Sequence, residues 1–385
     1  VAHFIKEKED NQSDTVRFRN LRYQTEQKAV QLALLKRNQP SYCKRIVGID
    51  AAASEFDTPP EVFAPAFRYL KRNGFKHFTY HAGEDFYHIL GGLRAIYEAI
   101  DFCGLSNGDR IGHGVATGIS TKLWTERIGK TLLMRQGDYL DDLLFARHLI
   151  TTEKNQNTDF VALIPLINSK ISTLSWQIYK ENVSVDTLDI VWKLRKYSPA
   201  ILCGQHSDQL NELLEILKVL NIAANEIRCT DERIRLLCMY HQREHRQKCN
   251  KIIEVETEEF FSTDQLTLLQ LIMLDFMHRK EIVIETLPSS NVRVGVHCNF
   301  DTYHLWNWYQ WKKQGHPIPP IVIGTDDAGI FATNIYNEYA NVYCNLTVTH
   351  KVSHDDAMNI IKQIDENSRI YRFENYTTYT KNEKE

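Results

Sequence analysis

The sequence of 385 residues lacks several features that would define other classes of protein. It has no long apolar run: even Leu266–Met277 is interrupted by Gln270 and Asp275, so no segment is suited to span a bilayer. Its eight cysteines are scattered, with no pair at C-x-x-C spacing, which argues against a disulfide framework and predicts reduced thiols in a cytoplasm. A net charge of −3 gives no overall attraction to nucleic acid or to anionic membranes.

Hydrophobic residues make up 43% of the chain and charged residues 25%, which is typical of a soluble globular protein. We find no internal repeat and no long low-complexity tract. The first third alternates short apolar runs with amphipathic stretches, which predicts strands at 1–5, 45–49, 76–81 and 110–113 and helices at 62–73 and 89–103. Such alternation is typical of βα units around a parallel sheet.

The middle of the chain follows a different pattern. From about residue 115 to 281 it is mostly helical, with helices expected at 131–149, 209–220, 231–248 and 264–279. The last is preceded by Ser262 and Gln265 at capping-box spacing. Strands return at 282–287 and 321–325, with helices at 303–313, 338–348 and 355–364. We therefore predict barrel elements in 1–114, a helical insertion in 115–281, and further barrel strands, terminal helices and a polar tail in 282–385.

Three groups of chemistry-bearing residues follow predicted strands, namely His81-Ala82-Gly83-Glu84, Arg110-Ile111-Gly112-His113-Gly114 and Thr325-Asp326-Asp327. Histidine is a common zinc ligand, and adjacent carboxylates repel each other unless a cation or an amine compensates. A lone histidine at a strand end is usually a surface or capping residue, and Asp-Asp after a strand often caps a helix. All three groups at the carboxyl ends of barrel strands together favour a mononuclear metal hydrolase.

These motifs resemble the signatures of the adenosine deaminases, a family of the metal-dependent amidohydrolase superfamily. Weaker family motifs are matched by Gly48-Ile49-Asp50-Ala51-Ala52, Pro288-Ser289-Ser290-Asn291, His316-Pro317 and Glu366-Asn367-Ser368. The resemblance extends over residues 1–115 and 281–372. It implies an α/β fold, a (β/α)8 TIM-type barrel of which strands three to eight are present, with a large helical insertion.

The resemblance also implies a catalytic site with one Zn²⁺ ion. His81 and Asp326 would ligate the zinc, Glu84 would donate a proton to N1 of the purine ring, and His113 would orient and deprotonate the water that attacks the ring. Zinc brings the pKa of such a water to about 7. A dry pocket would favour the protonated form of Glu84 that this chemistry needs.

Two further residues would hold the substrate by the same resemblance. The backbone N–H of Gly83 would donate to the ring, and Asp327 would hydrogen-bond N7. Hydrolysis would release ammonia and convert adenosine, or an adenine nucleotide such as ATP, to the 6-oxo product, inosine or ITP.

One family motif is missing. No His-x-His triplet, which ends the first barrel strand in the family, occurs in the sequence. We therefore expect that two strands and two further histidine ligands lie upstream of Val1, because six strands alone do not close the barrel.

The long insertion is similar to that of the large bacterial adenosine deaminases of RADAR-type antiphage systems. This resemblance implies a homo-oligomer with an ATPase partner, acting on adenosine or adenine nucleotides in antiviral defence. The CRISPR-associated adenosine deaminases fused to a cyclic-oligonucleotide sensor are the second resemblance, and a catalytically silent scaffold is the alternative function.

Three other features of the sequence bear on functions that compete with the deaminase hypothesis. His241-Gln242-Arg243-Glu244-His245 matches the H-x-x-E-H pattern of inverted zinc proteases, but a charged solvent-exposed face explains it better. The basic stretch 228–251 is suited to the phosphates of a nucleotide or RNA, although a solvated or subunit-contact helix is favoured. The motifs of the cytidine-deaminase fold are absent from the sequence.

Overall fold

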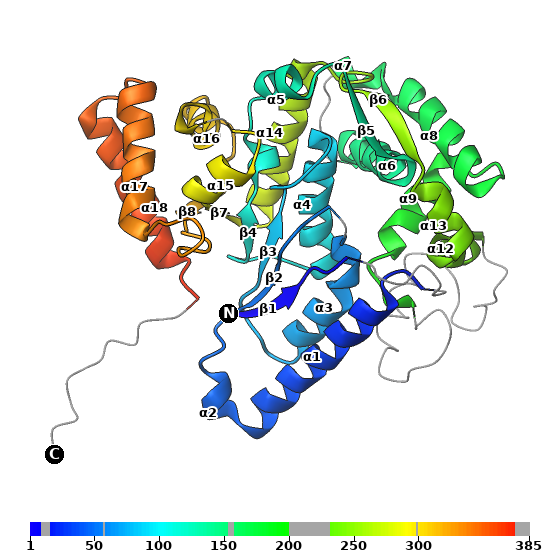
Figure 1. The fold of residues 1–385 in the computed structure, drawn as a ribbon, viewed down its shortest axis with the longest axis horizontal. Helices are drawn as coiled ribbons and strands as arrows, with labels where there is room; N and C mark the ends of the chain where they lie inside the picture. The colour runs from blue at the N-terminus through cyan, green and yellow to red at the C-terminus, as the bar shows by residue number, and fades with distance from the viewer. Residues whose placement is uncertain (9–15, 57, 153–157, 200–231, 298, 374–385) are drawn as a thin grey trace.

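The computed structural model describes residues 1–8, 16–56, 58–152, 158–199, 232–297 and 299–373. At its centre lie six short parallel strands: β1 (Ala2–Ile5), β2 (Ile49–Ala52), β3 (Thr79–Ala82), β4 (Arg110–His113), β7 (Val283–Thr286) and β8 (Ile321–Ile323). β1 pairs with β2, and β3, β4, β7 and β8 form a four-stranded sheet in that order. A parallel bridge between Ile49 and Phe78 links the two groups, and the strands lie side by side in Figure 1.

The parallel strands are apolar because both of their faces are covered. Ile49, Ile111 and Ile284, one from each of three strands, are fully buried, as expected for strands between layers of helices. This mixed α/β architecture is compatible with the predicted TIM-type fold. Among the described residues the strands do not close into a ring, and the eight-stranded barrel stays a prediction.

Helices on the outer side of the first strands form one aromatic core with them. α3 (Ala64–Arg72) packs between α1 (Arg19–Asn38) and α4 (Ile89–Cys103). From α3 the fully buried ring of Phe67 contacts the ring of Phe78 at a centroid distance of 5.6 Å and that of Tyr80 at 5.8 Å. A buried phenylalanine contributes roughly 1.5–3 kcal/mol through its apolar area, so these contacts hold β3 firmly in place.

Several predicted elements are confirmed. α4 and β4 have the predicted bounds, and the capping box of Ser262 and Gln265 begins α14 (Thr263–Arg279). The strand predicted at 45–49 instead runs from Ile49 to Ala52 as β2, because these are the residues that pair with β1.

The segment between β4 and β7 contains two strands as well as helices. β5 (Thr131–Arg135) pairs antiparallel with β6 (Ile252–Glu256). The prediction of a helix over 131–149 is therefore wrong at its start: the helix, α6, is Gln136–Thr152. The partner of β5 lies more than a hundred residues away, so no local pattern indicates the pairing.

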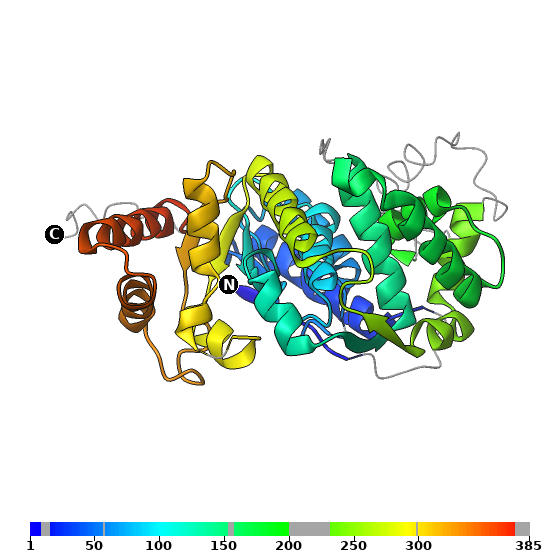
Figure 2. The same ribbon diagram turned by 90° about the horizontal axis from the view of Figure 1, so that it is seen from above.

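Most helices of this segment gather at one end of the molecule, opposite α17 (Ile335–Cys344) and α18 (His354–Ile370) (Figures 1 and 2). They are α6, α7 (Thr158–Val161), α8 (Ile164–Tyr179), α9 (Val185–Leu194), α12 (Glu232–His241) and α13 (Arg243–Cys249). α5 (Thr121–Ile128) instead packs against α14 near the middle of the molecule. The helix predicted at 209–220 lies outside the described residues.

The helix predicted at 231–248 is broken at Gln242, where the backbone is extended, so His241 and His245 belong to different helices. Both histidines and Arg246 are buried, at most 5% exposed. The predicted solvent-exposed face is therefore wrong for these three residues, because α13 packs against α6 and α8, whereas Arg243 and Glu244 are exposed.

The C-terminal part adds two short helices, α15 (Pro288–Val294) and α16 (Leu305–Lys313), and a π-helix over Asn345–Thr349 after α17. In the N-terminal part, the short helix α2 (Pro40–Cys43) packs against α1. No helix in the described part of the chain has both the length and the apolar character needed to cross a membrane.

Candidate active site

The carboxyl ends of β3 and β4 bring two of the predicted catalytic motifs together. The two strands are paired in register, Ala82 opposite His113, so His81 and His113 lie at the same edge of the sheet. Their imidazole rings have a centroid distance of 5.0 Å. Sequence spacing predicted each motif separately, and the parallel pairing makes them one site.

A buried carboxylate orients His81. Asp50, 1% exposed at the start of β2, accepts from Nδ1 of His81 at 3.1 Å and lies 2.9 Å from Nδ1 of His3. Burial by itself raises the pKa of Asp50, but these hydrogen bonds outweigh it and lower the pKa to about 2. Burial by itself would lower the pKa of His81, but the hydrogen bond to Asp50 outweighs burial, so the pKa of His81 is raised. Since Asp50 holds the Nδ1 proton, Nε2 of His81 is left with its lone pair available.

Glu84 and His113 form a second cluster with residues of α15. Oε1 of Glu84 lies 3.0 Å from Nδ1 of His113, which is 1% exposed. The amide nitrogen of Asn291 lies 2.8 Å from the same Nδ1, and Ser290 donates to Glu84 at 3.4 Å. Asn291 Oδ1 accepts from the N–H of Leu287, which fixes the amide so that its NH₂ group faces His113.

The fixed amide of Asn291 determines the hydrogen-bonding role of Nδ1 of His113. Because Asn291 donates to Nδ1 of His113, that nitrogen acts as an acceptor. The same amide also donates to Oε1 of Glu84 at 3.5 Å. Asn291 therefore ties the Glu84 carboxyl group and the His113 ring to one fixed donor, and it holds both beside the strand ends.

The predicted ring donor at Gly83 already has a partner. Its backbone N–H donates to Oε2 of Glu55 at 2.7 Å, and the N–H of Glu84 donates to the other carboxylate oxygen at 3.2 Å. Gly83 has a φ of +78°, and a Cβ at this position would come within 2.5 Å of Ile96. Glycine is required here on both counts, and a ligand that uses this N–H must displace Glu55.

Carboxylates crowd the loop after β3. Burial, followed by the charges of Glu55 and Glu84, raises the pKa of Asp85 to about 6. A site with several such groups stabilises a bound group that carries positive charge or donates hydrogen bonds.

Asp326 and Asp327 follow β8 at the same edge of the parallel sheet but are exposed. The N–H of Asp327 donates to Oδ1 of Asp326 at 2.9 Å, and no contact joins either carboxylate to His81 or His113 among the described residues. Asp326 and His113 both have a positive φ, +55° and +67°, which is strained for residues other than glycine. Such strain is concentrated at functional sites.

The donor chemistry at His81 fits a zinc ion, because an imidazole whose Nδ1 is held by a carboxylate is the usual form of a zinc ligand. Within the described residues, no three His, Cys, Asp or Glu side chains are grouped closely enough to hold a metal. This also leaves His241 and His245 without the third ligand that a protease site would need. The described part of the chain thus contains one imidazole that is oriented as a candidate ligand, and the exposed carboxylate of Asp326 lies at the same sheet edge.

Three of these residues had no predicted role. Asp50 and Asn291 occur in two segments that match weak family motifs. These matches were the signal in the sequence that could have indicated a role for each residue. Glu55 lies in the loop after β2, and no pattern in the sequence indicates that its carboxylate reaches Gly83.

The fold and these strand-end clusters define the class: an α/β protein with a candidate acid, base and metal-binding histidine at adjacent parallel strands. Residues 8–130 match the sequence model of the adenosine deaminase family. N6-Methyl-AMP deaminase from Homo sapiens is 34% identical over 67 residues, which cover 17% of this chain and 17% of that protein. The same protein from Bos taurus matches equally, and the match spans less than a fifth of either relative. These matches support the adenosine deaminase family.

Proposed function

We propose that the protein is a zinc-dependent aminohydrolase that deaminates adenine in nucleosides or nucleotides. The observation that carries this proposal is the clustering of His81, Glu84 and His113 at two adjacent strand ends, inside the segment that matches the deaminase family. The names of the curated relatives, which act on an adenine nucleotide derivative, support the same substrate class.

The roles of the chain's own residues follow from their contacts. Glu84, beside the acceptor nitrogen of His113, would deliver its proton to N1 of the purine, which withdraws electrons from C6. Nε2 of His113, whose Nδ1 is held by Asn291, would hold the attacking water on the opposite side of its ring. Water adds at C6, ammonia leaves, and a 6-oxo purine remains.

His81 and Asp326 would hold the metal, and Asp50 would keep His81 oriented for it. When bound, zinc would supply the acidification of water that makes hydroxide accessible at neutral pH. Removing zinc with a chelator should abolish turnover, and adding zinc back should restore it. Gly83 and Asp327 would contact the purine ring once Glu55 has moved from the Gly83 N–H.

The decisive test uses the native full-length protein with adenosine, AMP, ATP and an adenine-containing RNA. Mass spectrometry should detect exchange of the amino group for oxygen on at least one of them. Glu84→Gln should lower kcat by about 10²–10⁴-fold, because it removes the proton donor. Glu126→Gln, an exposed carboxylate on α5, is the matched control and should leave the rate unchanged. Equal rates for the Glu84 variant and the wild type would contradict the assignment.

We propose further that this deaminase serves bacterial antiphage defence, as a cytoplasmic homo-oligomer that works with an ATPase partner. The long segment between β4 and β7 supports this proposal through its resemblance to the large RADAR-type enzymes. The Glu84→Gln variant tests it against the scaffold alternative: defence should be lost with turnover, whereas undiminished defence would favour a silent scaffold.

A further inference from the structure

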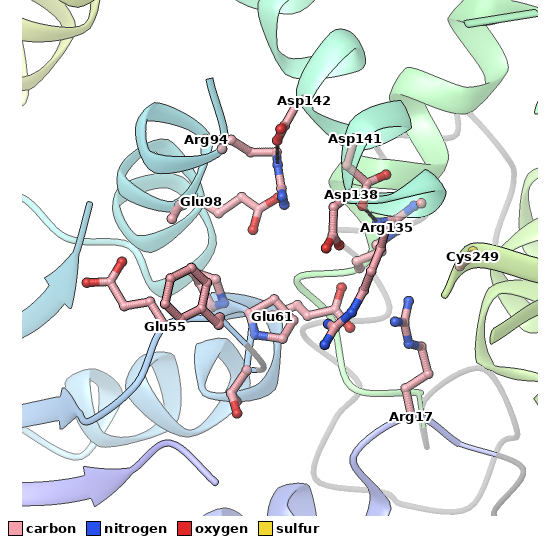
Figure 3. Close-up of a pocket in the computed structure, with 18 of the residues that line it drawn as sticks. Arg17, Glu55, Glu61, Arg94, Glu98, Arg135, Asp138, Asp141, Asp142 and Cys249 are labelled. Atoms are coloured by element: carbon pink, nitrogen blue, oxygen red, sulfur yellow. Dashed lines mark hydrogen bonds and ion pairs between the residues drawn. The ribbon is translucent and has the colours of Figure 1, made fainter. Parts of the chain in front are cut away.

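A cavity of about 260 Å³ adjoins the candidate active site. At one end it is lined by His81 and Ala82 of β3 and by Asp85 in the loop after β3, and at the other by the start of α6 and by α13. Figure 3 shows charged side chains of both signs converging on it, including Arg94 from α4, Asp138 and Asp141 from α6, and Arg17 from the turn before α1. The helical segment between β4 and β7 thus supplies one wall of a space that reaches the strand ends.

Most carboxylates near α4 are already paired. Arg94 donates from Nε to Asp142 at 2.7 Å and from Nη1 to Glu98 at 3.1 Å. Glu98 also accepts from the indole of Trp192 at 2.8 Å. The carboxyl groups on this side of the cavity are hydrogen-bonded within the protein and have little need of a ligand.

The opposite side contains two arginines whose hydrogen-bonding capacity is only partly used. The guanidinium carbons of Arg17 and Arg195 lie 4.4 and 3.8 Å from the ring centroid of Tyr240. Nε of each arginine is buried without a hydrogen-bond partner, and Arg195 is only 6% exposed. Arg195 pairs through Nη1 with Asp141 at 2.6 Å, whereas no carboxylate of the described chain pairs with Arg17. Glu61, the carboxylate beside them, is shared by Arg22 and Tyr240.

A buried imidazole adds a further unused group at this corner. His245 is 4% exposed, its Nδ1 lies 3.4 Å from Sγ of Cys249, and its Nε2 has no partner. Burial, and then the charges of Arg17 and Arg195, lower the pKa of His245 to about 3, so the ring is neutral. When Nδ1 accepts from the thiol, Nε2 carries the proton and is a donor without a partner on a residue that lines the cavity.

Unpaired buried donors are costly unless a ligand satisfies them. Arginine forks match phosphate oxygens through parallel, charge-assisted hydrogen bonds, and a neutral imidazole N–H adds another donor. The carboxylates on this side weaken the attraction only in part, since Asp141 is held by Arg195 and burial raises the pKa of Asp138. The corner formed by Arg17, Arg195 and His245, called here the arginine corner, is therefore suited to a phosphate group.

We propose that the arginine corner binds the 5′-phosphate of an adenine nucleotide whose base lies at the His81–Glu84 end of the same cavity. The inference rests on the proposed function and makes it more specific: the substrate is a nucleoside phosphate, selected over adenosine by residues from outside the strand-end motifs. Arg17 is the residue that decides this preference, because no carboxylate of the described residues pairs with its guanidinium.

The test compares AMP and adenosine in the native full-length protein. Arg17→Met keeps an unbranched side chain beside Tyr240 but removes the guanidinium and its charge. It should lower kcat/KM for AMP about 10–100-fold more than for adenosine, mainly through KM, as expected for loss of a hydrogen bond between charged groups. Arg17→Lys should recover part of the preference, and Arg19→Met, an exposed arginine on α1, should have no effect. Equal losses on both substrates, or a wild type that prefers adenosine, would overturn the proposal.

Two further measurements separate this proposal from the proposed function. If neither substrate is deaminated, the proposed function fails, and calorimetry with AMP still decides the arginine corner: tighter binding than adenosine that is lost in Arg17→Met supports it, and equal binding overturns it. Inorganic phosphate should compete with AMP in the wild type. Phosphate that binds without competing would show a separate anion site and overturn the assignment to substrate.

Discussion

Single side chains in this protein are controlled by partners that are distant in sequence. Asp50 precedes His81 by 31 residues, yet their hydrogen bond decides which imidazole nitrogen of His81 is available. Glu55 similarly reaches two backbone N–H groups of the loop after β3. At this scale, what each functional group can do is decided by a neighbour that adjacent strands bring into contact.

Glu55 offers a prediction at this scale. Since its carboxylate occupies the Gly83 N–H that the purine ring would use, Glu55→Ala should lower KM for the substrate by about 2–10-fold, the equivalent of one competing hydrogen bond. Steady-state kinetics measures this, with Glu55→Gln, which keeps an acceptor oxygen, giving a smaller change. A higher KM in Glu55→Ala would instead show that Glu55 contacts the substrate.

Among the elements, α4 depends on an unusual cap. His88 is the N-cap: its Nδ1 accepts from the N–H of Leu90 at 3.1 Å, and its Nε2 donates to the carbonyl of Thr257 at 3.1 Å. The side chain is 4% exposed, and burial lowers its pKa to about 4. The neutral ring thus joins the start of α4 to the residue that follows β6.

This cap predicts a dependence of stability on pH. The unfolded chain takes up a proton at His88 as pH falls below about 6.5, whereas the folded chain resists until about 4, so the contribution of His88 is lost on acidification. We expect His88→Asn, which can cap but does not titrate, to cost about 1–3 kcal/mol at pH 7. Urea unfolding should show this deficit shrinking by about 1–2 kcal/mol at pH 5. A deficit independent of pH would contradict the role of His88 protonation.

Across the whole molecule, the segment between β4 and β7 shares a core with the strand region. Trp192 of α9 is fully buried, and its ring packs against Tyr97 and Phe102 of α4 at centroid distances of 5.8 and 6.0 Å. α6 also packs along α4. The boundaries predicted at residues 114 and 281 therefore mark a change in the sequence pattern. The hydrophobic core is continuous between the segments on either side of them.

A shared core predicts cooperative unfolding of the two regions. Trp192→Ala should lower the free energy of unfolding by about 3–5 kcal/mol, because it opens a large cavity and leaves Glu98 with one fewer hydrogen bond. Hydrogen exchange should show reduced protection in α4 as well as in α9. Trp192→Phe, which keeps most of the buried ring, is the milder control. Loss of protection confined to the helical segment would show that it unfolds as a separate unit.

Local signals in the sequence were sufficient for the rhythm of strands and helices in the first third, for the capping box of α14, and for the His81, Glu84 and His113 motifs. Apolar periodicity, caps and glycine turns act within a few residues, so these elements can be predicted without knowing their neighbours. The resemblance to the adenosine deaminases depends on the same motifs.

The tertiary structure alone decided what pairs with what. It placed Asp50 on His81, Asn291 on His113 and Glu55 on Gly83, paired β5 with β6, and buried His245 where a solvent-exposed face was expected. Each of these contacts joins residues far apart in the chain, or depends on which face of a helix another helix covers. Such contacts follow from the packing of the complete core rather than from any local pattern, which is why the charged cavity and its arginine corner appear only in three dimensions.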